Sequence, residues 1–226
     1  MKELFFKEIK TLMSSWLALS VALAFQFLSI WFLWISPYSD TIVSAGVADW
    51  YPFLNWVTLP LMLVCSVLSL HAFAEEMQRG TYDALFSLPV SYVQIAIAKY
   101  YAAAAVLLFV LIPSLFQTFL IRYFALPNIA LDYGVFLISF CGILLCGMAF
   151  LALGIFATLF ARNIWVSWVL GLMIMGVFAQ SVVGNFGVQA HLFAFNRGVF
   201  SMEDFFYFLN IIVIGIVLIT FKLKPR

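Results

Sequence analysis

Six long apolar runs constrain this chain more than any other feature of its sequence. A helix needs about 20 predominantly apolar residues to cross the hydrocarbon core of a bilayer. The runs that reach or approach this length are residues 16–35, 53–73, 100–121, 133–160, 164–183 and 205–221. They are continuous, whereas the strands of a membrane β-barrel alternate apolar and polar residues. We therefore expect an all-α integral membrane protein with six transmembrane helices in a single domain over residues 1–226.

Composition argues against most other classes. The chain is 66% hydrophobic and 9% charged, whereas about a quarter of the residues in a soluble domain are charged. The net charge of +1 gives no support for nucleic-acid binding. Cys65, Cys141 and Cys146 all lie in apolar runs, so we expect small buried hydrophobes rather than disulfides or metal ligands. The first run is longer than the roughly 7–15 residues of a signal-peptide core, which predicts a retained anchor.

The basic residues predict the orientation of the spans, because short cytoplasmic loops carry an excess of lysine and arginine. If the N-terminus lies inside, two basic residues, Arg122 and Arg197, fall on the outer side. The nine on the cytoplasmic side are then Lys2, Lys7, Lys10, Arg79, Lys99, Arg162, Lys222, Lys224 and Arg226. We therefore expect a multi-pass protein with both termini in the cytoplasm.

Residues 2–13 precede the first span and have the pattern of an amphipathic helix. Its apolar face would hold Leu4, Phe5, Ile9, Leu12 and Met13, and its polar face Lys2, Glu3, Lys7 and Lys10. A helix of this kind can lie in the plane of the membrane interface. The alternative, which the sequence leaves open, is a cytoplasmic extension of the first span.

The segment between the second and third runs, residues 75–99, carries a complete set of helix start and stop signals. A glycine suited to end one helix is followed by a threonine that can cap the next and a proline that ends it. A serine and a glutamine then have the spacing of a capping box for a third helix. These residues are Gly80, Thr81, Pro89, Ser91 and Gln94. We therefore expect a short helix, residues 82–87, lying across the cytoplasmic ends of two spans.

The outer segment between the fifth and sixth runs, residues 184–204, is apolar but interrupted by glycines. Its aromatic side chains are poorly suited to water, so we expect short interfacial helices that dip into the outer leaflet. The residues proposed as an outer gate in this hairpin are Phe193, Phe195, Arg197 and Gly198. Ser201 is expected to cap the sixth span, with Asp204 as its capping-box partner.

Catalytic and nucleotide-binding motifs do not occur in the sequence. There is no P-loop, HExxH or GxSxG pattern, and His71 and His191 are predicted to lie on opposite sides of the membrane. We expect no catalytic, cofactor or metal site in this chain. The polar residues deep in the runs are Gln26, Gln117 and Gln180, for which interhelical hydrogen bonding and the lining of a substrate path both stay open.

Residues 74–91, AEEMQRGTYDALFSLPVS, followed by Lys99, resemble the cytoplasmic signature of type-2 ATP-binding-cassette (ABC-2) permeases. That signature is roughly EE-x-x-x-GT-x-[ED]-x-L-x-x-x-PVS followed by lysine. The outer residues 191–209 are similar to the branch of gliding-motility permeases. The six runs and the amphipathic start fit the same family, so the resemblance covers the whole chain.

The resemblance implies a permease subunit of an ABC transporter in the bacterial cytoplasmic (inner) membrane, acting as an exporter more often than an importer. A separate ATP-binding subunit would hold the ATP and Mg²⁺, so this chain would not itself be an enzyme. A homodimer or heterodimer of permeases is also implied, and the first and fifth spans offer small residues for its interface. The residues implied to couple the permease to the ATP-binding subunit are Glu75, Glu76, Arg79, Gly80, Thr81, Asp83, Leu85, Phe86, Leu88 and Pro89.

A second hypothesis comes from a different class of protein. The chain could be a membrane scaffold or assembly component that works with an ATPase and moves no soluble substrate. The scarcity of polar residues in the runs favours this hypothesis. A secondary carrier is less well supported, because no acidic residue lies at mid-depth in the spans, where proton-coupled carriers usually place one.

Overall fold

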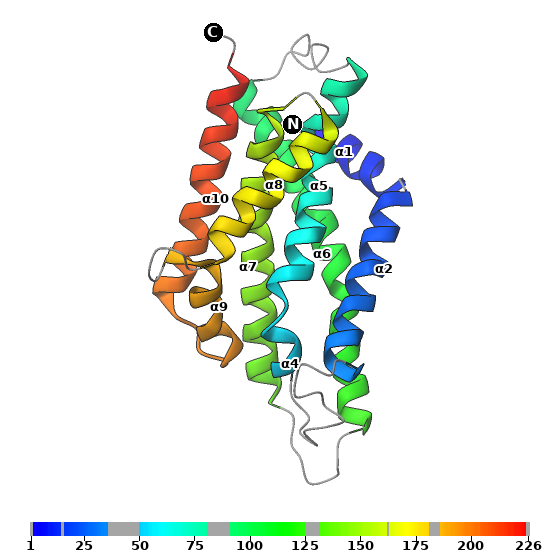
Figure 1. The fold of residues 1–226 in the computed structure, drawn as a ribbon, viewed down its shortest axis with the longest axis vertical. Helices are drawn as coiled ribbons and strands as arrows, with labels where there is room; N and C mark the ends of the chain where they lie inside the picture. Colours follow the sequence, from blue (N-terminus) through cyan, green and yellow to red (C-terminus); the bar gives the residue numbers. More distant parts are fainter. Residues whose placement is uncertain are drawn as a thin grey trace.

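The computed structural model describes residues 2–14, 16–35, 50–80, 91–124, 132–161, 163–180 and 186–224. Within these residues every regular element is a helix, as expected (Figure 1). The elements are α1 (Lys2–Ser14), α2 (Trp16–Ile30), the π-helical turn η1 (Trp31–Ile35), α4 (Tyr51–Leu54), α5 (Thr58–Arg79), α6 (Tyr92–Phe124), α7 (Tyr133–Thr158), α8 (Ile164–Ala179), α9 (Val188–Asn196) and α10 (Met202–Leu223).

Four of the described helices, α5, α6, α7 and α10, are long and apolar enough to cross a membrane by themselves. The α1 helix and the α2–η1 helix meet at a bend of 65° and pass the same test only as a pair. The apolar helix α8 has 16 residues. At 1.5 Å per residue it is about 24 Å long, which is shorter than the roughly 30 Å of a bilayer core. The described residues therefore support four or five spans, and the predicted count of six stays a prediction.

Helix α7 is the centre of the bundle. It packs against α5, α6, α8, α9 and α10, and nearly every residue from 149 to 158 is buried. Figure 1 shows α10 on one side of α7 and α2 at the opposite edge of the molecule. A Cβ built on Gly215 of α10 would lie 2.7 Å from the Cβ of Ala152 on α7, so these two backbones approach closely. Close packing of this kind is a main source of helix affinity in lipid.

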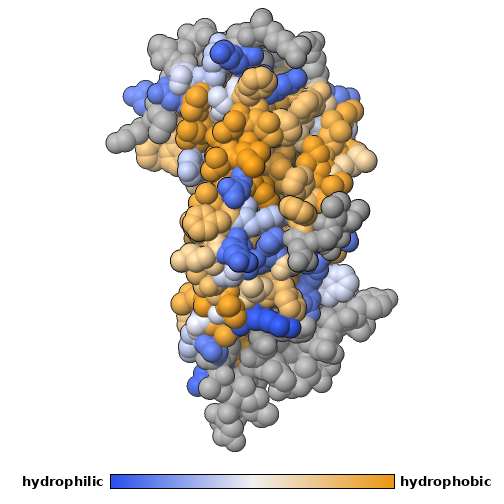
Figure 2. Space-filling view, turned by 90° about the vertical axis from the view of Figure 1, so that its left-hand side faces the viewer, coloured by the Kyte–Doolittle hydropathy of each residue, from blue (hydrophilic) through white to orange (hydrophobic). Residues whose placement is uncertain are grey.

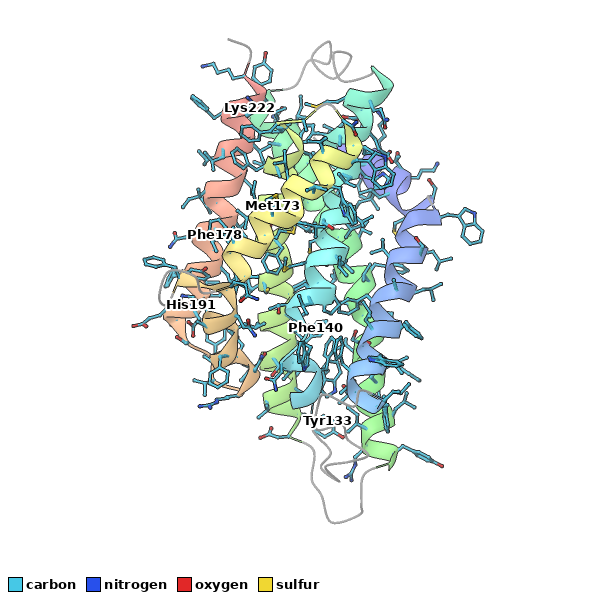
Figure 3. The ribbon with its side chains drawn as sticks, in the orientation of Figure 1. Tyr133, Phe140, Met173, Phe178, His191 and Lys222 are labelled. Carbon is cyan, nitrogen blue, oxygen red and sulfur yellow. The ribbon has the colours of Figure 1, made fainter. Side chains whose placement is uncertain are left out.

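One end of the bundle gathers segments that are far apart in the sequence. Helices α1 and α6 begin at this end, and α5 and α10 finish there (Figure 1); we call it the α1 end. Lys222 lies at the α1 end and Tyr133 at the opposite end (Figure 3). The arrangement agrees with the expectation that residues 2–13 and 75–99 share one side of the membrane. Which side this is stays a prediction.

The second and third spans begin at different residues from those expected. Helix α5 begins at Thr58 rather than Phe53, because a turn separates it from the short helix α4. Pro60 lies in the first turn of α5, where a missing N–H breaks no helical hydrogen bond. Helix α6 begins at Tyr92, before the predicted start of the third span at Tyr100. The capping residues set the first residue of this helix, whereas hydropathy marks only its apolar part.

The small residues that the first and fifth spans offer for a dimer interface are Ser20, Ala22, Ala24, Gly171, Gly176 and Ala179. Three of them lie inside the protomer. Ala22, Gly171 and Ala179 are buried in the protomer's own packing. Ser20 and Ala24 are exposed on α2. The dimer itself stays a prediction, and its interface would need the exposed positions of α2 and α8 rather than the buried ones.

The outer surface of the protein is strongly apolar. The face that carries α10 has a broad apolar area, with hydrophilic residues gathered at its upper end and in its lower half (Figure 2). On α10, Ile214, Val217 and Phe221 are all exposed, as suits a surface in contact with lipid.

Among the cysteines, Cys65 and Cys146 are buried as expected, but Cys141 is exposed because it lies on the outward side of α7.

Candidate functional site: the α1 end and its buried ion cluster

The boundaries of the predicted coupling segment are well defined by local structure. Helix α5 ends at Gly80, whose φ of +71° lies in the left-handed region and whose N–H donates to the carbonyl oxygens of Glu76 and Met77. Ser91 and Gln94 form the expected capping box: the N–H of Ser91 donates to Gln94 Oε1 at 3.2 Å, and the N–H of Gln94 donates to Ser91 Oγ at 3.3 Å. The remaining predicted coupling residues lie outside the described part of the chain: Thr81, Asp83, Leu85, Phe86, Leu88 and Pro89, with the helix 82–87.

A buried ion cluster joins α5 and α6, the two helices that flank this segment, to α1. The ammonium of Lys99 on α6 is 2.8 Å from Glu76 Oε1 on α5 and 3.3 Å from Glu8 Oε1 on α1. The Lys99 side chain is fully buried, and its Nζ also lies 5.1 Å from the centre of the Phe73 ring. A buried charge needs close partners to offset its loss of hydration, and these three groups provide them.

Two of the residues implied to couple the chain to an ATP-binding subunit, Glu75 and Glu76, make contacts inside the protomer, and their coupling role stays a prediction. Glu76 contacts Lys99 within the chain, and Glu75 lies 2.6 Å from Nδ1 of His71, one turn earlier on the same helix. Both carboxylates are therefore engaged inside the protomer. Arg79 is the last residue of α5, one position before the end set by Gly80.

Glu8 is a site residue that the sequence analysis missed. The amphipathic helix was assigned an apolar face that includes Leu4 and Leu12. Glu8 falls four residues after the first and four before the second, and residues at this spacing share one face of a helix. All three are buried. An acidic residue in the middle of an apolar helix face is therefore the signal that could have identified it.

Two of the three predicted path residues are joined by hydrogen bonds. Gln117 Nε2 on α6 donates to Gln26 Oε1 at 3.0 Å and to Ser29 Oγ at 2.6 Å, both on α2. Gln26 Nε2 donates in turn to the carbonyl oxygen of Val110 at 2.9 Å. Gln180 is not part of this network, because it is exposed at the end of α8. The geometry therefore favours the interhelical hydrogen-bonding hypothesis for Gln26 and Gln117, and the prediction that Gln180 is buried is wrong.

The outer hairpin separates the predicted gate residues into two environments. Phe195 is fully buried, and a Cβ added to Gly142 of α7 would meet its side chain, so Phe195 packs in the core of this structure. Its role in an outer gate stays a prediction. Phe193 is 43% exposed, and the guanidinium of Arg197 lies 4.0 Å from the centre of its ring. Gly198 follows with a φ of +75°.

Helix α9 is tied to α10 by a polar contact that the sequence analysis did not predict. His191 Nδ1 lies 2.6 Å from Asp204 Oδ1, and the imidazole stacks on the ring of Tyr207 at 3.8 Å between centroids. Figure 3 shows His191 on the side of the molecule where α9 meets α10. Asp204 also donates its N–H to Ser201 Oγ at 3.4 Å, which confirms the predicted cap.

An apolar groove of about 470 Å³ lies between α1, α6 and α7. Three alanines of α6 line it and leave space that larger side chains would fill. The residues that line it are Phe5, Ile97, Ala98, Tyr101, Ala104, Ala105, Leu108, Leu144 and Met148. With the Tyr101 hydroxyl as the only polar side-chain group among these residues, the groove is suited to apolar contacts.

Several long apolar helices and an exposed apolar surface define a multi-pass membrane protein. Residues 7–220 match the family model described as ABC-2 family transporter protein. Since this match covers most of the chain, the protein belongs to the ABC-2 transporter family and is a transport permease subunit. No curated protein gives a significant match to the sequence.

Proposed function

We propose that this chain is the transmembrane subunit of an ATP-driven exporter, powered by a separate ATP-binding subunit that docks on residues 75–91. That partner would bind the ATP and Mg²⁺, and this chain would have no catalytic role. The observation that carries the proposal is the pair of helix boundaries at Gly80 and Ser91, which present a ten-residue segment between two long helices at one end of the bundle.

The same proposal fixes the orientation. The α1 end would face the cytoplasm of a bacterial cell, because it holds basic residues of three helices: Lys7 of α1, Lys99 beside Glu8 of the same helix, and Lys222 near the end of α10 (Figure 3). Both termini would then be cytoplasmic, and α9 would lie in the outer half of the inner membrane. Two permease copies, identical or different, would form the complete transporter.

The proposal is tested by purification of the affinity-tagged chain from its native membranes. We expect a protein with a P-loop to copurify, and the purified pair to hydrolyse ATP faster than that protein alone. Phe86→Ala should release the ATP-binding subunit more readily than Asp83→Ala, because truncated aromatic anchors typically cost about 2 kcal/mol or more in binding, whereas rim charges cost less. If neither variant changes binding or ATP turnover, residues 75–91 are not the docking segment.

The second candidate function, a membrane scaffold that works with an ATPase and moves no soluble substrate, is favoured by one observation. Gln26 and Gln117 bond to each other across α2 and α6 instead of facing an open path. The two functions differ in vesicles that contain the reconstituted pair. Export predicts ATP-dependent movement of a cargo across the bilayer, whereas the scaffold hypothesis predicts ATP turnover without any such movement.

A further inference from the structure

Lys99 joins three helices at the base of the proposed docking segment. It contacts Glu76 at the end of α5 and Glu8 on α1, and it lies itself near the start of α6. We propose that Lys99 is a positioning residue, which makes the amphipathic helix α1 move together with the two helices that carry the docking segment. This inference rests on the proposed function, because it concerns how motion of the ATP-binding subunit reaches the membrane domain.

The position of the Glu76–Lys99 pair along the chain supports this role. Glu76 accepts the N–H of Gly80 through its backbone carbonyl and binds Lys99 through its side chain. Lys99 lies about two turns after Ser91, where α6 begins. The ion pair therefore links the end of α5 to the start of α6. A force on the residues that connect these two helices would then move both helix ends together.

The Glu8–Lys99 contact extends this unit to a helix that is distant in sequence. Glu8 lies between Leu4 and Leu12 on the face of α1 that packs against the bundle, and its side chain is 10% exposed. An apolar residue at this position would avoid the loss of hydration that a buried carboxylate suffers. Buried ion pairs often contribute little net stability but can fix how two elements are positioned relative to each other. In this protein the Glu8–Lys99 contact would fix the position of α1 relative to α6.

The contacts of the cluster come from three helices. Lys99 of α6 lies beside Glu76 of α5 and Glu8 of α1, whereas Lys7, one residue before Glu8, is exposed. Removal of the Glu8 carboxylate breaks the link to α1 but leaves the Glu76–Lys99 pair intact, which makes Glu8 the most selective position for a test.

The test uses the purified permease with its copurifying ATP-binding subunit in lipid nanodiscs. Three variants are compared with the parental chain: Glu8→Gln, which removes the charge; Glu8→Leu, which completes the apolar face between Leu4 and Leu12; and Glu3→Gln, a control at an exposed position of the same helix. The measurements are the amount of ATP-binding subunit retained, ATP turnover per assembled complex, and hydrogen exchange of residues 2–14.

We expect Glu8→Gln and Glu8→Leu to retain the ATP-binding subunit while turnover per complex falls by about five-fold or more, the lower end of typical coupling between sites. Glu8→Leu should keep the slow hydrogen exchange of residues 2–14, because its apolar contacts hold α1 in place, and Glu3→Gln should match the parental chain. Parental turnover per complex in Glu8→Leu would show that α1 needs only apolar packing and would overturn the inference.

The failure of this inference is distinct from the failure of the proposed function. If the parental chain assembles with no ATP-binding subunit, the proposed function is wrong and the inference falls with it. If the parental pair forms and turns over ATP, but both Glu8 variants lose turnover only in proportion to lost assembly, the proposed function stands and the positioning role of Lys99 does not.

Discussion

The side-chain nitrogen of Gln117 lies 2.6 Å from the hydroxyl oxygen of Ser29, across the contact between α6 and α2. Gln117 is buried, and its second contact, with Gln26, joins the same two helices. In lipid, a hydrogen bond between helices contributes about 0.6 kcal/mol on average and up to about 1.7 kcal/mol. The pair of contacts therefore gives α2 a specific position against α6.

We predict that Gln117→Leu lowers the free energy of unfolding by about 1–2 kcal/mol, because two such bonds are lost and Gln26 Oε1 loses the Gln117 donor. The measurement is unfolding of the purified permease in mixed micelles. Gln180→Leu is the matched control, because Gln180 is exposed, and it should leave unfolding unchanged. Equal stability of Gln117→Leu and the parental chain would show that the network is dispensable.

Gly215→Val should destabilise the contact between α7 and α10. The added Cβ alone would lie 2.7 Å from that of Ala152, so the helices must separate, and overpacking of this kind typically costs about 1–3 kcal/mol. Gly171→Ala is the control, since its Cβ would meet nothing closer than 4.0 Å. In detergent, the thermal unfolding midpoint of Gly215→Val should be well below the midpoints of Gly171→Ala and the parental chain. An unchanged midpoint for Gly215→Val would contradict the close approach.

Gly80→Val should uncouple the transporter without preventing its assembly. The φ of +71° is unfavourable for any residue with a Cβ, by roughly 1–2 kcal/mol, and more for a β-branched one. Among the described residues, none beyond its chain neighbours lies within 4 Å of the added Cβ, so the expected effect comes from the backbone conformation. Gly80→Asn, which tolerates this conformation better, should retain most of the ATP turnover per complex. Similar turnover in Gly80→Val and Gly80→Asn would argue against a role for this helix end.

Cysteine labelling should distinguish the two aromatic positions of α9. In a Cys141→Ala background, which removes the exposed native thiol, Phe195→Cys should stay unreactive because the position is fully buried. Phe193→Cys should react with a membrane-permeant reagent but not with a bulky aqueous one, because its exposed side would face lipid. Rapid aqueous labelling at Phe193→Cys would place α9 in water and refute the membrane-dipping hairpin.

Local backbone signals in the sequence predicted the structure best. The end of α5 at Gly80, the capping box at Ser91 and the cap at Ser201 all follow from interactions within a few residues of the chain. Such signals depend on the identities of near neighbours, so one sequence is enough to recognise them. The long apolar runs predicted α6, α7 and α10 for the same reason, although capping moved the start of α6.

Tertiary contacts were beyond the reach of the sequence. The partner of Glu8 lies 91 positions away on α6, and no local pattern identifies it. Phe195 and Phe193 are both aromatic residues in one short helix, and the packing of α9 against Gly142 of α7 and Phe208 of α10 buries only the first of them. Gln180 was placed inside a span by hydropathy, but α8 ends at Ala179 and leaves it exposed.

The enclosure of α7 bears on where cargo would be recognised. Because residues 149–158 are nearly all buried among the neighbouring helices, a conduit along this part of α7 would have to dismantle the protomer's own core. We therefore expect a transported molecule to travel along the exterior of each protomer, in a seam shared with a second copy. Residues that determine cargo selectivity should then be sought among exposed side chains such as Phe27 and Met173 rather than in the interior; Figure 3 labels Met173 on α8.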